Sequence, residues 1–248
     1  MRLHRGRLPA LAMIGLAMAP WGCGSDTKDL TAPILSLGGT VRESEGRVVE
    51  IDLAKSKATD ADLALLGAFA DLKTLKLAEC PITDAGLPRL AAATKLQMLR
   101  LSGTKISDAG LAQLAPLQGL RDLDLSNTQV GDSGLAQLAP LTGLLKLNLY
   151  TTRVTDAGLD HLQVLKNLTS LNLDKTQVSD AGLPKLEPLV QLEFLHLGRT
   201  QITDAGLKSV MKLTKLTKIH VTHTKVTAAG VKQLEQALPR CKVVWKVE

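Results

Sequence analysis

The chain has 248 residues and a formal net charge of +6; 45% of its residues are hydrophobic, but only 2% are aromatic. A core with so few rings must consist of stacked aliphatic side chains, which suits repeated layers better than one globular core. The charge does not indicate a nucleic-acid partner, because the basic residues form no stripe with interleaved aromatic rings. Three arginines also lie in an N-terminal segment that we expect to be removed, which leaves a charge of +3.

The N-terminus resembles an export signal. Residues 1–22 combine a basic start with an apolar stretch that is too short to span a bilayer, and Gly22 directly precedes Cys23. This arrangement resembles the lipobox of bacterial lipoproteins. We therefore expect cleavage before Cys23 and lipidation of its thiol, which would anchor the protein to the cell-envelope membrane. The alternative is cleavage after residues 17–19 and export as a soluble periplasmic or secreted protein.

The next segments are expected to connect the anchor to the main fold and to cap it. Residues 23–32 read as a polar tether that begins with the lipidated cysteine, and residues 33–47 read as an N-terminal cap. Within the cap, residues 33–37 predict a short helix with proline near its start. Residues 40–42 and 47–53 are expected to pair across a turn. Such a cap would cover the leucines of the first layer.

From there, one block repeats almost to the end of the chain. The block from Leu72 to Lys95 recurs with a constant step of 24 residues, starting again at Leu96, Leu120, Leu144, Leu168, Leu192 and Leu216. A period in the twenties built on L-x-x-L-x-L is typical of a leucine-rich-repeat solenoid. We therefore predict an α/β fold, a right-handed solenoid with a concave parallel β-sheet and short helices on the convex side. It comprises eight repeats over residues 48–239 and a capping strand over residues 240–248.

Each repeat has the same predicted anatomy. The first, fourth and sixth positions point inward, and the third, fifth and seventh point outward. A threonine such as Thr104 follows most strands and is expected to bond to loop backbone that would otherwise lack a partner. A Ser/Thr-Asp-Ala-Gly segment then starts a helix, with the hydroxyl as N-cap and the aspartate near the positive helix end. The recurring glycine, as at Gly86, indicates close backbone packing.

The repeat unit LxxLxLxxTxITDAGLxxLxxL resembles the leucine-rich repeats of bacterial envelope proteins. It is also similar to the cysteine-containing leucine-rich repeats of F-box substrate receptors, and the likeness covers residues 47–248. The resemblance implies a protein-binding role and names no ligand. We do not extend a ubiquitin-related activity to this chain, because the sequence before its repeats reads as an export signal.

The sequence predicts no enzyme, cofactor or metal site. Residues 131–134 read GDSG, the string around a trypsin-like nucleophilic serine, but they align with the helix start of a repeat and have no triad partners. No phosphate loop or paired nucleophile and base is present. Cys80 and Cys241 are expected to be buried thiols, because they lie too far apart for a disulfide and lack metal-ligand spacing.

The outward strand positions carry the clearest functional signal. They hold the only tyrosine and one of the two phenylalanines, together with two histidines on neighbouring strands. We predict that a protein or peptide partner binds here, through Tyr150, Asn172, Asp174, Phe194, His196 and His220. The two histidines would supply only two metal ligands, fewer than a stable site needs. One alternative is a structural or adhesive envelope protein whose rings stack on polysaccharide or cell wall. Another is binding by the convex helices.

Overall fold

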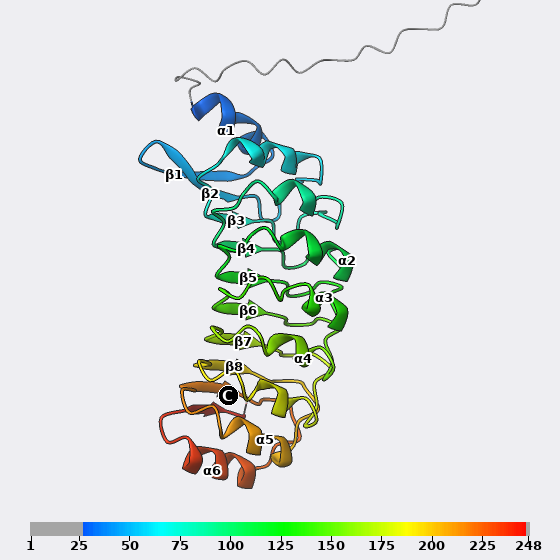
Figure 1. Ribbon diagram of the computed structural model, residues 1–248, viewed down its shortest axis with the longest axis vertical. Helices are drawn as coiled ribbons and strands as arrows, with labels where there is room; N and C mark the ends of the chain where they lie inside the picture. The colour runs from blue at the N-terminus through cyan, green and yellow to red at the C-terminus, as the bar shows by residue number, and fades with distance from the viewer. Residues whose placement is uncertain (1–26, 247–248) are drawn as a thin grey trace, which may run out of the picture.

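The computed structural model describes residues 27–246, which form an elongated stack of coils (Figure 1). The predicted export signal and Cys23 lie outside these residues. Strands line one side of the stack and short helices line the other. None of the helices in residues 27–246 has the length and apolar character needed to cross a membrane. In chain order, with η for 3-10 helices, the elements are α1 (Thr27–Ser36), β1 (Thr40–Ser44), β2 (Arg47–Asp52), η1 (Asp62–Ala68), β3 (Thr74–Lys76), η2 (Leu87–Leu90), β4 (Met98–Arg100), α2 (Asp108–Leu111), η3 (Ala112–Leu114), β5 (Asp122–Asp124), α3 (Asp132–Ala136), β6 (Lys146–Asn148), α4 (Leu159–Leu162), β7 (Ser170–Asn172), η4 (Leu183–Leu186), β8 (Phe194–His196), α5 (Asp204–Val210), β9 (Lys218–His220), α6 (Ala228–Ala237) and β10 (Lys242–Val244).

Helix α1 is longer than the predicted cap helix. It begins at Thr27, so residues 27–32 are helical rather than part of a tether, and Pro33 lies inside the helix. The reason is an apolar stripe at spacing i, i+4, i+7. Ile34 is fully buried, and Leu30 and Leu37 pack beside it against the core. Burying one such side chain contributes about 1.5–3 kcal/mol, which offsets the hydrogen bond that the proline removes.

The predicted hairpin in the cap is confirmed. Strands β1 and β2 pair antiparallel, with Thr40 opposite Asp52. The turn is tighter than expected, because Glu45 and Gly46 both adopt positive φ, at 52° and 71°. Two consecutive residues with positive φ make a type I′ turn, whose twist matches that of the strands it joins. Strand β1 therefore continues to Ser44.

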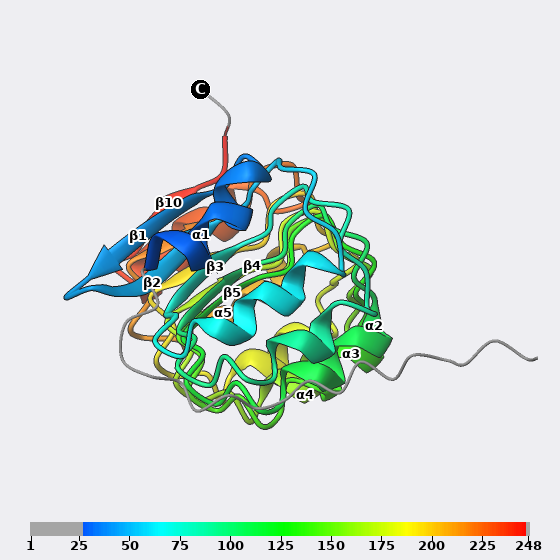
Figure 2. The same cartoon turned by 90° about the horizontal axis from the view of Figure 1, so that it is seen from above.

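Each coil of the repeat contributes one strand to the sheet. The strand order follows the chain from β1 to β10, and β2 to β10 are parallel. Each strand is in register with the same position of the next coil, as where Leu75 pairs with Leu99. The view along the stack shows the strands superimposed on one side of the coil and the helices on the other (Figure 2). The inward leucines are buried, as the two-residue period predicts.

The threonines that follow β4 to β9 have the predicted role. Thr104 is buried, and its hydroxyl donates to the carbonyl oxygen of Leu101 at 2.6 Å. The same bond, at 2.6–2.7 Å, recurs at Thr128, Thr152, Thr176, Thr200 and Thr224. In an early coil Cys80 takes the position, and its Sγ donates to the carbonyl oxygen of Leu53 at 2.9 Å. The polar row thus satisfies buried strand-end carbonyls.

The helix starts differ from prediction in two respects. Within residues 27–246 the hydroxyl acts as an N-cap only in α5 and α6, where Thr203 and Thr227 accept backbone N–H groups, while η2, α4 and η4 begin after a glycine. The second difference concerns the aspartates. The 24-residue spacing places each aspartate against the following coil, where its carboxylate accepts hydrogen bonds. In the GDSG segment, the backbone N–H of Gly131 donates to Asp108 Oδ1 at 2.6 Å, and the Ser133 hydroxyl donates to Asp108 Oδ2 at 2.5 Å. The segment therefore performs a structural task. Close packing at the recurring glycines is confirmed, but the atom beside Gly134 is an Asp108 carboxylate oxygen rather than backbone.

Candidate binding site on the concave face

Three of the predicted residues form one ring cluster on β8 and β9. The strand register sets His196 beside His220, and their imidazoles stack with centroids 4.5 Å apart and an interplanar angle of 14°. The Phe194 ring lies 5.6 Å from His220 and 6.3 Å from His196, tilted against both. We call these three side chains the ring cluster. Their partial exposure on a hydrogen-bonded sheet gives the concave face a preorganised aromatic surface.

Asp174 and Tyr150 form a second group, through an arginine that the sequence pattern did not indicate. Arg199 donates from Nε to Asp174 Oδ1 at 2.9 Å and from Nη2 to Asp174 Oδ2. The hydrogen bonds with Asp174 raise the pKa of Arg199. The same guanidinium carbon lies 5.5 Å from the centre of the Tyr150 ring, within the range of a cation–π contact. The Asp174 side chain is only 6% exposed, and both of its carboxylate oxygens are bound to Arg199.

Arg199 was missed because it occupies the eighth position of its coil, which the strand alternation does not count as outward. That position has positive φ in every coil, and its residues are Lys55, Glu79, Gly103, Asn127, Thr151, Lys175, Arg199 and His223. At Arg199 this left-handed backbone accompanies a side chain that reaches Asp174 and Tyr150 on the concave face. The sequence signal that could have identified Arg199 was therefore the row of mostly polar residues at the eighth position of each coil.

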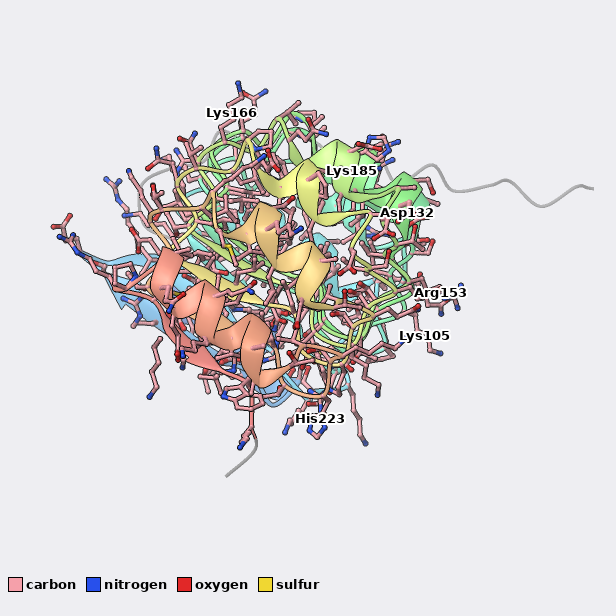
Figure 3. All side chains as sticks on the ribbon, turned by 90° about the horizontal axis from the view of Figure 1, so that it is seen from below. Lys105, Asp132, Arg153, Lys166, Lys185 and His223 are labelled. Carbon is pink, nitrogen blue, oxygen red and sulfur yellow. The ribbon has the colours of Figure 1, made fainter. Side chains whose placement is uncertain are left out.

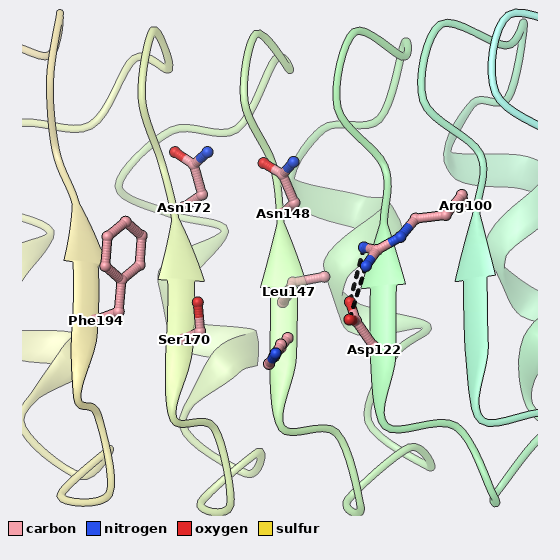
Figure 4. A pocket seen from close by; sticks show the side chains of 8 residues that line it. Arg100, Asp122, Leu147, Asn148, Ser170, Asn172 and Phe194 are labelled. Atoms are coloured by element: carbon pink, nitrogen blue, oxygen red, sulfur yellow. Dashed lines mark hydrogen bonds and ion pairs between the residues drawn. The ribbon is translucent and has the colours of Figure 1, made fainter. Parts of the chain in front are cut away.

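A hollow of about 210 Å³ adjoins the ring cluster on the concave face. Its lining residues are Arg100, Asp122, Lys146, Leu147, Asn148, Ser170, Asn172 and Phe194, and Figure 4 shows the Phe194 ring at one end and the Arg100–Asp122 pair at the other. Asp122 accepts from both terminal nitrogens of Arg100, each at 2.8 Å. Asn172, a predicted site residue, joins the hollow to the ring cluster. Lys146 and Asn148 belong to the same surface but were not among the predicted residues.

The ring cluster is uncharged at neutral pH. Burial lowers the pKa of His196 to about 4, although the neighbouring Asp174 carboxylate, 4.0 Å from Nδ1, acts in the opposite direction. Burial also lowers the pKa of His220, and the Lys218 ammonium lowers it further. Both imidazoles are therefore neutral at pH 7. Within residues 27–246, no three His, Cys, Asp or Glu side chains gather in a way that would hold a metal ion.

Other charged side chains lie around the rim of the coil. In the end-on view, Lys105, Arg153 and Lys166 extend from the circumference of the stack into solvent (Figure 3). Lys185 also lies on this rim, and its Nζ donates to Asp160 at 2.5 Å. These charges are spread around the stack rather than gathered at one place.

Comparison with known proteins confirms the fold. A family model described as "Leucine Rich repeat" matches residues 70–91, 92–115, 118–139, 164–186 and 192–211. No curated protein sequence matches the chain. Among solved structures, internalin C2 from Listeria monocytogenes is similar with a TM-score of 0.64 and 24% identity, over 88% of this chain and 93% of that one. A leucine-rich-repeat protein from Leptospira interrogans has a TM-score of 0.58 and 19% identity, over 73% of this chain and 45% of that one.

These findings establish the predicted leucine-rich-repeat solenoid and place it beside structures from bacteria. At such low identity the two structures share the fold alone with this chain. The chain spans less than half of the Leptospira protein. The lipid anchor and the similarity to F-box substrate receptors stay predictions.

Proposed function

We propose that this leucine-rich-repeat solenoid is a scaffold that binds a protein or peptide on its concave face. Leucine-rich-repeat proteins generally serve as protein-binding scaffolds, and their stacked coils give an extended rigid surface. The observation that carries the proposal is the ring cluster. In a chain with 2% aromatic residues, Phe194 gathers with two stacked, neutral histidines on the exposed side of the sheet. Rigid rings bind a partner at a low cost in side-chain entropy.

The proposal is for binding without catalysis. The serine of the GDSG segment donates its hydroxyl to Asp108, an acceptor that orders the backbone of the next coil. Asp174 is held by Arg199 in a two-point contact, and Asp122 is held by Arg100 in the same way. Carboxylates fixed in ion pairs are poor general bases, because their charge is already compensated.

The proposed location is the bacterial cell envelope, with the chain anchored through lipid on Cys23. The support is the sequence of residues 1–23, and the short distance in sequence from Cys23 to α1 would hold the solenoid near the membrane. Metabolic labelling with palmitate tests this part. The parent should incorporate label and fractionate with membranes, while Cys23→Ser should do neither. Equal membrane association of the two proteins would contradict the anchor and leave the binding proposal standing.

A cross-linked pull-down tests the binding site. The immobilised full chain is compared with Phe194→Ala/His220→Ala and with a control, Val164→Ala/Val190→Ala. The control removes apolar side chains that are 49% and 52% exposed on the turns after α4 and η4. Circular dichroism checks that all three proteins are folded. A partner retained by parent and control but lost by the ring-cluster variant is the expected result.

Two other outcomes are informative. If the control variant alone loses the partner, the helical side binds and the concave proposal is wrong. If the ring-cluster variant loses a polysaccharide rather than a protein, the chain is an adhesive envelope protein instead.

A further inference from the structure

The concave face near the ring cluster presents mainly hydrogen-bond donors. Oδ1 of Asn148 accepts the backbone N–H of Tyr150 at 3.1 Å, and Oδ1 of Asn172 accepts that of Asp174 at 2.9 Å. Neither Asn Nδ2 has a hydrogen-bond partner among residues 27–246, so each can donate, and Figure 4 shows the two amides in the same orientation on neighbouring strands. His196 follows the same pattern, since its Nδ1 accepts from Gly198 N–H at 3.2 Å. In the neutral ring, Nε2 then carries the proton and is a donor.

The lysines of this surface are a second source of donors. The strand register aligns one row across β6 to β10, and its residues are Lys146, Ser170, Phe194, Lys218 and Lys242. None of these three lysines forms an ion pair within residues 27–246. No carboxylate occupies a third or fifth strand position from β6 to β10. The cations of this row are therefore free to pair with a ligand.

The N-terminal half of the same face is different. Lys76 lies 2.8 Å from Glu50 and 3.1 Å from Asp52, so its charge is compensated within the sheet. Arg100 is likewise bound to Asp122. At the third and fifth strand positions, β2 to β5 thus carry four carboxylates and two cations, an excess of negative charge, whereas β6 to β10 carry three lysines and no carboxylate.

From this contrast we infer that the partner segment is an extended acidic peptide that crosses β6 to β9, with an apolar side chain on Phe194 and carboxylates at Lys146 and Lys218. The inference rests on the proposed function and specifies its ligand. Lys146 and Lys218 are three strand spacings apart, about 14 Å. In an extended chain, residues i and i+4 are separated by about 13 Å, and residues i, i+2 and i+4 face the same way. The matching pattern is acidic-x-apolar-x-acidic.

The hollow beside Phe194 fits this arrangement. It lies between Lys146 and the Phe194 ring, and its other walls include the free amides of Asn148 and Asn172. A carboxylate side chain in the hollow would accept from these donors, and the peptide carbonyls would accept from the amides that remain. An anionic polysaccharide would also satisfy the lysines, but it has no apolar side chain to cover Phe194. The ring cluster therefore favours the peptide.

Selection from a displayed random peptide library tests the inference and does not require an identified partner. The full chain is immobilised, and enriched peptides are sequenced and resynthesised with a fluorophore for anisotropy measurements. Expected peptides carry Asp or Glu at i and i+4 with an apolar residue between them. Replacing both acids by Gln in the peptide should weaken binding.

The protein variants are matched in charge. Lys146→Gln/Lys218→Gln removes two cations from the row, and Lys166→Gln/Lys208→Gln removes two exposed lysines elsewhere. We expect the first variant to weaken acidic-peptide binding by about two- to fivefold per lysine, as for exposed ion pairs, and the second to leave it unchanged. The difference in peptide affinity between the two variants should shrink at high salt.

Three results would count against the inference, and they differ. Enriched peptides that depend on Phe194 but contain no excess of acids would overturn the acidic ligand and leave the proposed function intact. Peptides that bind equally to parent and Phe194→Ala would overturn both. A third result would be that the parent binds polygalacturonate, Lys146→Gln/Lys218→Gln binds it more weakly, and acidic peptides do not bind. The ligand of the lysine row would then be an anionic polysaccharide.

Discussion

Asp132 of one coil is hydrogen-bonded to Thr155 of the next coil through both carboxylate oxygens. Oδ1 accepts the backbone N–H of Thr155 at 2.8 Å, and Oδ2 accepts its hydroxyl at 2.6 Å. The same two-point contact recurs in Asp60–Thr83, Asp84–Ser107, Asp156–Ser179, Asp180–Thr203 and Asp204–Thr227. The Thr155 hydroxyl also accepts from Ala157 N–H at 3.2 Å, so Asp132 orders the start of the following helix.

Asp132→Ala should destabilise the protein by about 1–3 kcal/mol, because the N–H and hydroxyl of Thr155 both lose their acceptor in a partly buried place. Asp132→Asn should cost less, since its amide keeps one acceptor oxygen. Urea unfolding followed by circular dichroism measures the change. Lys166→Ala, at an exposed position, is the control and should stay within about 0.5 kcal/mol of the parent. An unchanged unfolding midpoint for Asp132→Ala would show that its contact with Thr155 is not needed for stability.

Gly158→Ala should also destabilise, although alanine is favoured over glycine in helices by about 1 kcal/mol. A Cβ at Gly158 would meet Oδ1 of Asp132 well inside van der Waals distance. We expect a cost of about 1–3 kcal/mol from this overpacking. In an Asp132→Ala background the obstructing carboxylate is gone, so adding Gly158→Ala should cost less there than in the parent. Equal costs in both backgrounds would mean that the glycine is required for another reason.

The repeat explains which features could be predicted. The threonine row, the inward leucines and the glycine row each occur many times at one spacing, so the members of each set could be predicted to have the same role in every coil. The partner of Asp132 was not predicted, because it lies in the next coil and its contact depends on the exact offset between coils. The length of helix α1 was underestimated, because local preference places a proline at the start of a helix, whereas the burial of Ile34 extends this helix to both sides of Pro33.

The concave face shows the same division. The aromatic and histidine positions were found from strand alternation, and the structure brings Phe194, His196 and His220 together. The role of Asp174 depends on Arg199, which lies 25 residues later and outside the alternating positions. Single-copy contacts of this kind have no periodic signal, so only the structure identifies which charges are already paired.

Stability should fall as pH decreases from about 6.5 toward 4, because of the ring cluster. The pKa of His196 is lowered to about 4 in the folded chain, while a histidine in the unfolded chain titrates near 6.5. Between these values the unfolded state binds more protons, so the stability present above pH 6.5 is lost as the pH falls through this window. His220, whose pKa is also lowered, adds to the loss. The expected decrease is about 1–3 kcal/mol.

Urea unfolding at several pH values in this window measures the effect. His196→Gln should flatten the profile, because glutamine does not titrate. His161→Gln, at an exposed position in α4, should keep the slope of the parent. If the parent and His196→Gln have the same slope, the histidine stack is protonated in the folded protein without cost, and our account of its burial is wrong.

Arg199→Ala should destabilise the protein more than the removal of Arg199 and the Asp174 charge together. The single variant leaves a carboxylate whose side chain is 6% exposed without its two-point partner, and breaking such a pair costs several kcal/mol when it is fully buried. Arg199 itself is 47% exposed, so water can replace part of the contact, and we expect about 2–3 kcal/mol. In Arg199→Ala/Asp174→Asn no charge remains buried, and the loss should be smaller. Urea unfolding of the parent, both single variants and the double variant completes the cycle. If the double variant is less stable than Arg199→Ala by the full cost of Asp174→Asn, the two residues act independently, and Asp174 is free to meet a partner as the strand alternation indicated.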